Sequence, residues 1–227
     1  MILMDLLPIA LLGGVLGMDV VTFPQAMISR PIVAATVAGA FIGNAPAGLI
    51  MGAVLELLAL EMLPFGASRY PEWGSASVVG GALYAAQPND PPGALAASLF
   101  AALVTALLSG KSMVWLRRLN ASLAARERAA LQEGSRQSVT GLQLFGLSAD
   151  LGRGFAVTML SMVVFSGLIE AIVATWGTDA RYSRAAVVAV VAAVSAGAIW
   201  KIFHAVPRAR FLFIAGLAVG AMVLVTA

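Results

Sequence analysis

Residues 31–74 read PIVAATVAGAFIGNAPAGLIMGAVLELLALEMLPFGASRYPEWG, two apolar runs separated by the turn sequence GNAP. The first run, residues 32–42, is too short for a helix that crosses a hydrocarbon core of about 30 Å, and the second run only just reaches across it. Asn44 can cap the second helix and Pro46 can begin it. We therefore expect a broken-helix, re-entrant-like hairpin at about 32–63.

Interrupted helices of this kind point to a transport site, because irregular backbone at membrane depth is tolerated only beside protein or a wet cavity. Glu56 lies deep within the second run. A carboxylate there costs about 2.5–3.5 kcal/mol to insert and usually faces a cavity or a partner. Two roles are open, namely contact with a transported substrate, which we favour, and a structural hydrogen bond to neighbouring helices. Glu61 lies about 140° around the helix from Glu56, so the two carboxylates do not pair on one face.

Composition places the chain in a membrane. It is 60% hydrophobic and 11% charged, with a mean hydropathy of +0.94, a balance that soluble domains do not show. We expect an all-α, polytopic membrane protein with roughly six to eight membrane segments. The net charge of +3 comes from basic residues in loops beside apolar segments, which the positive-inside rule explains without a nucleic-acid partner. With no cysteine and one histidine, we expect no metal and no cofactor.

We interpret residues 1–227 as a single membrane domain in the bilayer. The opening segment lacks the basic region of a signal peptide, so we expect it to be retained as the first span. The parts of the domain are a site-bearing half at 3–110, a cytoplasmic basic loop at 111–153 and a C-terminal helical half at 155–226. The spans expected outside the hairpin are 3–21, 93–108, 155–176, 185–200 and 211–225, with a short apolar stretch at 75–87.

Topology follows from the basic residues that crowd positions 111–136, which place this loop in the cytoplasm. Within it, WLRRLNASLAARERAALQ is amphipathic, and we interpret it as a surface helix on the inner leaflet, with docking of a soluble partner as the alternative. A glycine-rich connector follows, and Arg153 marks the start of the next span. Counting spans from the loop puts Arg30 at the inner membrane surface, and QPNDPPG and both termini outside, although Arg181 and Arg184 then fall on the outer side.

Five polar residues are candidates for binding a substrate. Asp19 ends the first span, where it is either interfacial or at the mouth of a site. The turn-rich loop at 64–77 carries two more, and Glu72 there either pairs with Arg69 or is solvated. The full candidate set is Glu56, Asp19, Glu72, Asn44 and Trp73.

The chemistry of this set favours a neutral, polyhydroxylated ligand, because carboxylates accept hydrogen bonds from hydroxyls and aromatic rings stack on apolar faces. The sequence carries no phosphate loop, no dinucleotide fingerprint and no nucleophile elbow. We therefore expect no catalytic residue in this chain. His204 is interpreted as an interfacial side chain, and Glu170 as either part of the site or near the outer interface.

The stretches SRPIVAATVAGAFIG and GNAPAGLIMGAVLELLALEMLPFGASRYPE resemble the enzyme IIC subunit of the mannose/fructose/sorbose class of the bacterial phosphotransferase system (PTS). The resemblance is clear over residues 5–110, and beyond them it concerns the layout of apolar segments. Ala45, Glu61 and Glu72 depart from the family pattern.

The resemblance implies a function and partners. It implies a bacterial inner-membrane, multi-pass permease subunit that moves a hexose inward beside a IID membrane subunit, in an oligomer. Phosphorylation is then the work of cytoplasmic IIA and IIB proteins, and this chain has no phosphoryl-transfer residue of its own. By resemblance Glu56 contacts the sugar, with Asp19 and Glu72 as weaker candidates. Two alternatives are a non-transporting scaffold or sensor of the same fold and an unrelated small-solute channel.

Overall fold

The computed structural model describes residues 3–60 and 70–226. Within these ranges the regular secondary structure is entirely helical and includes no strand, so the all-α prediction is confirmed. The helices are α1 (Leu3–Met18), α2 (Pro31–Ile42), α3 (Ala45–Ala59), α4 (Trp73–Ala85), α5 (Ala94–Arg126), α6 (Arg128–Gln132), α7 (Arg136–Ala174), α8 (Ala180–Phe203) and α9 (Ala209–Thr226).

The broken hairpin is present as predicted. Gly43 ends α2 with a φ of 91°, a conformation that favours glycine. The Asn44 side chain then accepts a hydrogen bond of 3.2 Å from the Ala47 N–H and caps α3. Close packing of the two arms depends on Gly48, where a Cβ would lie 2.4 Å from the Ala35 carbonyl oxygen.

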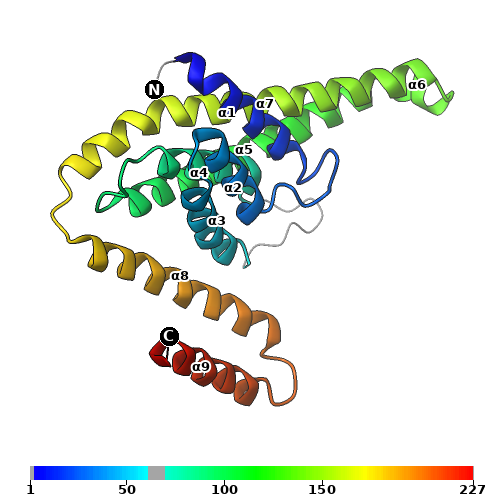
Figure 1. The fold of residues 1–227 in the computed structure, drawn as a ribbon. Coiled ribbons are helices and arrows are strands. Elements are labelled where there is room, and N and C mark those ends of the chain that lie inside the picture. Colours follow the sequence, from blue (N-terminus) through cyan, green and yellow to red (C-terminus); the bar gives the residue numbers. More distant parts are fainter. Residues whose placement is uncertain (1–2, 61–69, 227) are drawn as a thin grey trace.

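Helix α4 lies at the centre of the body, and all its residues from Gly74 on are buried. It contacts α1, α2, α3, α5 and α7, as Figure 1 shows. The loop expected to run to Ser77 therefore ends earlier, and Trp73 already begins the helix. Residues 61–69, which include Glu61 and Arg69, lie outside the described residues.

Most of the segment predicted as a basic loop, residues 111–153, consists of extensions of helices α5 and α7. Helix α5 has 33 residues and α7 has 39, whereas about 20 residues cross a hydrocarbon core. The polar ends of α5 and α7, joined by α6, form a helical projection that we call the arm (residues 111–149; Figure 1). The prediction of a glycine-rich connector before residue 155 is wrong, because this segment is part of helix α7. One of its glycines, Gly154, lets α7 pack closely against Gly14 of α1.

Helices α8 and α9 lie to one side of the body (Figure 1). Helix α8 contacts α3 and α5, and α9 packs on α8 through Trp200 and Phe213, whose ring centroids are 5.5 Å apart. In the described ranges α5, α7 and α8 are long and apolar enough to cross a membrane. Four shorter apolar helices, α1, α2, α3 and α9, accompany them. The protein is thus a multi-pass membrane protein.

Candidate functional site

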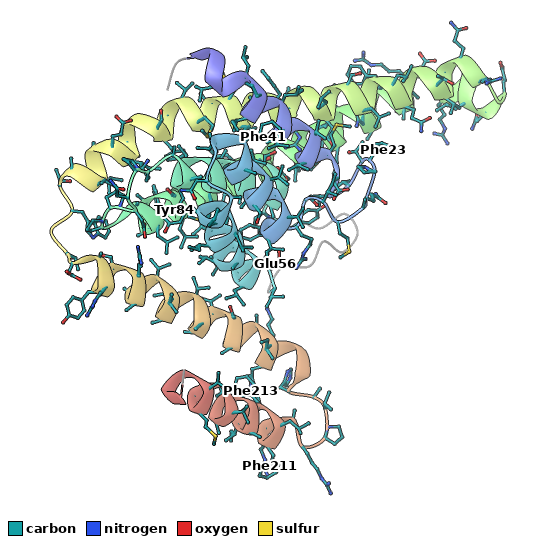
Figure 2. All side chains as sticks on the ribbon, viewed as in Figure 1. Phe23, Phe41, Glu56, Tyr84, Phe211 and Phe213 are labelled. Carbon is teal, nitrogen blue, oxygen red and sulfur yellow. The ribbon has the colours of Figure 1, made fainter. Side chains whose placement is uncertain are left out.

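Polar side chains collect at one end of the body, where α2 begins, α3 ends and α4 begins. Glu56 and Phe41, which lies near the hairpin turn, are at opposite ends of the hairpin (Figure 2). Arg30 just before α2 contacts Glu56, and Glu72 lies just before α4. The polar residues at this end come from parts of the chain that are far apart in sequence.

Glu56 forms an ion pair with Arg30. Its other carboxylate oxygen accepts a hydrogen bond of 3.2 Å from the Ile32 N–H at the start of α2. The pair joins both arms of the hairpin and retains access to its surroundings, since the Arg30 and Glu56 side chains are 30% and 20% exposed. Arg30 was predicted as an anchor facing the membrane surface, but its guanidinium turns to the carboxylate, because an unpaired acid in an apolar helix is costly.

Glu72 is fully buried and caps α4. The Ser75 N–H donates to its carboxylate at 3.1 Å and 3.3 Å, and the Ser109 hydroxyl donates to Oε2 at 2.7 Å. The Glu72 N–H donates to the Ala106 carbonyl of α5 at 3.0 Å. Glu72 therefore caps the start of α4 and fastens this helix to α5.

Arg153 of α7 extends this network, and sequence reasoning missed its role. Its Nη1 donates to Ser109 Oγ at 2.8 Å, and its Nε donates to Asp150 at 2.8 Å. Asp150 also accepts a hydrogen bond from the Thr22 hydroxyl in the connector between α1 and α2. The sequence signal that could have revealed this pair is an acid and a base three residues apart in an otherwise apolar stretch, because that spacing puts Asp150 and Arg153 on one helix face.

Asp19 holds that connector together. Its buried carboxylate accepts hydrogen bonds from the Ala26 N–H at 2.6 Å, the Ser29 N–H at 2.9 Å and the Ser29 hydroxyl at 2.8 Å. Burial raises the pKa of the Asp19 carboxyl, but the hydrogen bonds from Ser29 and Ala26 outweigh that effect, so the pKa lies below the ordinary value of 3.8. The carboxylate thus positions the segment that leads to Arg30.

Trp73 lies beside this polar end, whereas Asn44 does not. The Trp73 side chain packs against the cluster that contains Met51 and Leu55, and its buried Nε1 has no hydrogen-bond partner among the described residues. Asn44 precedes Glu56 by 12 residues, which is about 18 Å along a helix axis. The Asn44 amide donates to the Ala85 carbonyl at 3.4 Å, at the far end of α4.

Glu170 and His204, which the sequence analysis also considered, lie away from the polar end. Glu170 is exposed on α7, beyond the polar end of the body. His204 is exposed at the end of α8, where its Nδ1 lies 2.8 Å from the Lys201 carbonyl oxygen. Of the five candidate residues, the fold therefore brings Glu56, Glu72, Trp73 and Asp19 to one end and leaves Asn44 at the other.

Comparisons with known proteins agree with this architecture. A solved structure titled "Structure of membrane protein" matches with a TM-score of 0.77 and 16% identity, covering 100% of this chain and 94% of that chain. At this identity the likeness concerns the fold alone. A search of curated proteins found no match.

A family model described as "PTS system sorbose-specific IIC component" matches residues 3–181. This range includes the hairpin, the Arg30–Glu56 pair and the Asp150–Arg153 pair. It confirms the predicted resemblance. The chain therefore belongs to the sorbose-specific IIC family, the sugar-specific membrane components of the phosphotransferase system.

Proposed function

We propose that this chain is the IIC subunit of a sugar permease in a bacterial inner membrane and moves a hexose inward. Cytoplasmic IIA and IIB proteins supply the phosphoryl group, and a IID membrane subunit completes the translocating unit as an oligomer. The chain supplies binding and a path across the bilayer, and it performs no phosphoryl transfer itself.

The observation that carries this proposal is the partly exposed ion pair between Glu56 and Arg30. A carboxylate and a guanidinium at the end of a broken hairpin offer acceptors and donors that match sugar hydroxyls. Trp73 begins the adjacent helix and adds a ring together with a buried N–H that has no partner in the described part of the chain. Buried donors are normally satisfied, so this N–H is suited to a polar ligand or to water.

The fold also supports a mechanism by alternating access. The Glu56–Arg30 pair links the two hairpin arms, and the Glu72–Ser109–Arg153 network links α4, α5 and α7. We propose that the hexose binds between these two groups and that the hairpin moves against α4 to open the site to either side. Asp19 holds the connector that carries Arg30 and therefore acts as a positioning residue. Asn44 shapes the hairpin turn.

The test is uptake of a panel of radiolabelled hexoses into vesicles supplied with phosphorylated IIA and IIB proteins and the IID subunit. Glu56→Gln is expected to abolish uptake while membrane abundance stays unchanged. Losing one hydrogen bond to a charged group alone reduces binding about ten- to a hundredfold. Glu170→Gln is the matched control, because it makes the same change at an exposed carboxylate outside the polar end.

The outcomes separate the alternatives. Normal uptake by Glu56→Gln would reject the role assigned to this residue. Flux through the unaltered protein without any phosphate donor would instead indicate a small-solute channel. No uptake of any sugar with all partners present would indicate a scaffold or sensor.

A further inference from the structure

A groove with a volume of about 560 Å³ lies beside α5 at the base of the arm. Its α5 wall is formed by Leu107, Lys111, Val114 and Arg118, which recur every three or four residues and so share one helix face. Tyr70 and Pro71, just before α4, complete the lining together with Gly110. A Cβ on Gly110 would lie 2.4 Å from the Tyr70 carbonyl oxygen, so glycine allows this close approach.

The length of α5 indicates that the groove lies near the boundary between hydrocarbon and headgroups. Helix α5 begins at Ala94, and about 20 residues cross the hydrocarbon core, which places that boundary near Met113. Leu107 is then inside the hydrocarbon layer, whereas Arg118 is at headgroup depth. Trp115 is 72% exposed on the same helix and marks this level, because exposed tryptophans favour the membrane interface.

The charged residues that line the groove in the described part of the chain, Lys111 and Arg118, are both basic. Lys111 and Arg118 are exposed, and neither forms an ion pair in the part of the chain that the structure describes. The neighbouring Arg117 differs, since it donates to the Tyr70 hydroxyl at 2.6 Å and lies 5.3 Å from the centre of that ring. Arg117 thereby fixes Tyr70 at the groove, while the other two cations are available to an anion.

We propose that this groove binds an anionic phospholipid of the cytoplasmic leaflet. An acyl chain lies along Leu107 and Val114, and the headgroup phosphate lies between Lys111 and Arg118. Basic pockets beside membrane helices on the cytoplasmic side favour such headgroups. A soluble phosphate compound matches the cations but leaves the apolar wall uncovered, and Leu107 is 56% exposed there. Because Pro71 precedes Glu72, a bound lipid also steadies the start of α4.

The experiment uses the full chain in phosphatidylcholine vesicles that contain increasing amounts of brominated phosphatidylglycerol, which quenches nearby tryptophans. The quenching of Trp115 is the difference in fluorescence quenching between each protein and the same protein with Trp115→Phe. The double variant Lys111→Gln/Arg118→Gln is expected to need about thirtyfold more phosphatidylglycerol for half-maximal quenching, since each basic residue at an anionic surface contributes about fivefold. The control Arg126→Gln/Arg128→Gln removes the same charge from exposed positions near the end of the arm and is expected to change the midpoint less than about twofold.

Glutamine is a good helix former, so the variants are expected to retain their helical circular dichroism. The proposal is overturned if the double variant and the unaltered protein are quenched alike. It is also overturned if brominated phosphatidylcholine quenches Trp115 as strongly as the phosphatidylglycerol. A third contrary result concerns thermal stability. If inorganic phosphate added to phosphatidylcholine vesicles stabilises the protein as much as phosphatidylglycerol does, the groove binds a soluble phosphate compound instead.

Discussion

Arg153 is the cation of a buried group that also contains Asp150 and Glu72. The Asp150 and Arg153 side chains are 1% and 8% exposed, and Glu72 is fully buried. Arg153 pairs directly with Asp150 but reaches Glu72 only through the Ser109 hydroxyl. Its Nη2 is buried and has no partner among the described residues. The arrangement joins α7 to α5 and α4 through one side chain, so the charge balance of the polar end depends on it.

Replacing one member of the Asp150–Arg153 pair is expected to lower stability more than replacing both. Arg153→Gln leaves Asp150 buried without its cation and should cost about 3–5 kcal/mol of stability. The double variant Asp150→Asn/Arg153→Gln removes both charges and should recover a large part of that loss. Thermal unfolding in detergent measures the stability of both single variants and of the double variant, which together form a double-mutant cycle. Arg126→Gln is the control at an exposed position. Additive effects of the two substitutions would show that the pair contributes no coupling.

At the scale of the helices, glycine decides how closely they approach. Gly154 of α7 faces α1, where an added Cβ would lie 2.9 Å from Gly14 Cα. Gly152, two residues earlier on the same helix, has nothing within 4 Å of that position. Contacts between backbones of this kind are a common way for helices to associate in membranes, because lipid offers no hydrophobic gain for helix pairing.

Gly154→Ala is expected to destabilise the protein by about 1–3 kcal/mol, because the methyl group forces α1 and α7 apart. Gly152→Ala is the matched control and should be neutral or stabilising by about 0.5–1 kcal/mol, since alanine is the better helix former. Thermal unfolding of both variants in the same detergent gives the comparison. Equal effects would contradict the close packing of α1 against α7.

The elements that could be predicted from the sequence are those marked by local sequence signals. The hairpin was predicted because Gly43, Asn44 and Pro46 each mark a helix end in the sequence itself. Spans within α5 and α7 were predicted, but the full lengths of these helices were not, because their polarity changes along the chain while the backbone stays helical, and a change in charge does not end a helix. The Glu72–Ser109–Arg153 network joins residues up to 81 positions apart (153 − 72), and no spacing along the chain encodes such a contact. Glu56 was selected as a candidate because an acid in an apolar run is conspicuous, whereas its ion-pair partner Arg30 was predicted to face the membrane surface.

At the scale of the whole molecule, the arm and the turn before α5 lie at opposite ends of a membrane-crossing helix. Six basic residues and two acidic residues occupy positions 111–136, so the positive-inside rule predicts that this end lies in the cytoplasm. The polar end that holds Glu72 is fastened to α5 at Ala106 and Ser109, close to the arm. In this orientation the candidate site lies toward the cytoplasmic end of α5.

This orientation gives a prediction that the absence of native cysteine makes simple to test. Pro88→Cys in the turn before α5 and Gln132→Cys at the end of α6 each introduce a single thiol at an exposed position. In intact cells a membrane-impermeant maleimide is expected to label Pro88→Cys at once. It should label Gln132→Cys only after the membrane is opened, because the arm is then on the inner side. The protein without cysteine controls for background, and labelling of both variants after solubilisation shows that each thiol is reactive. The reverse pattern would show that the arm lies on the outer side of the membrane, and the polar end with Glu56 and Glu72 would then lie toward that side as well.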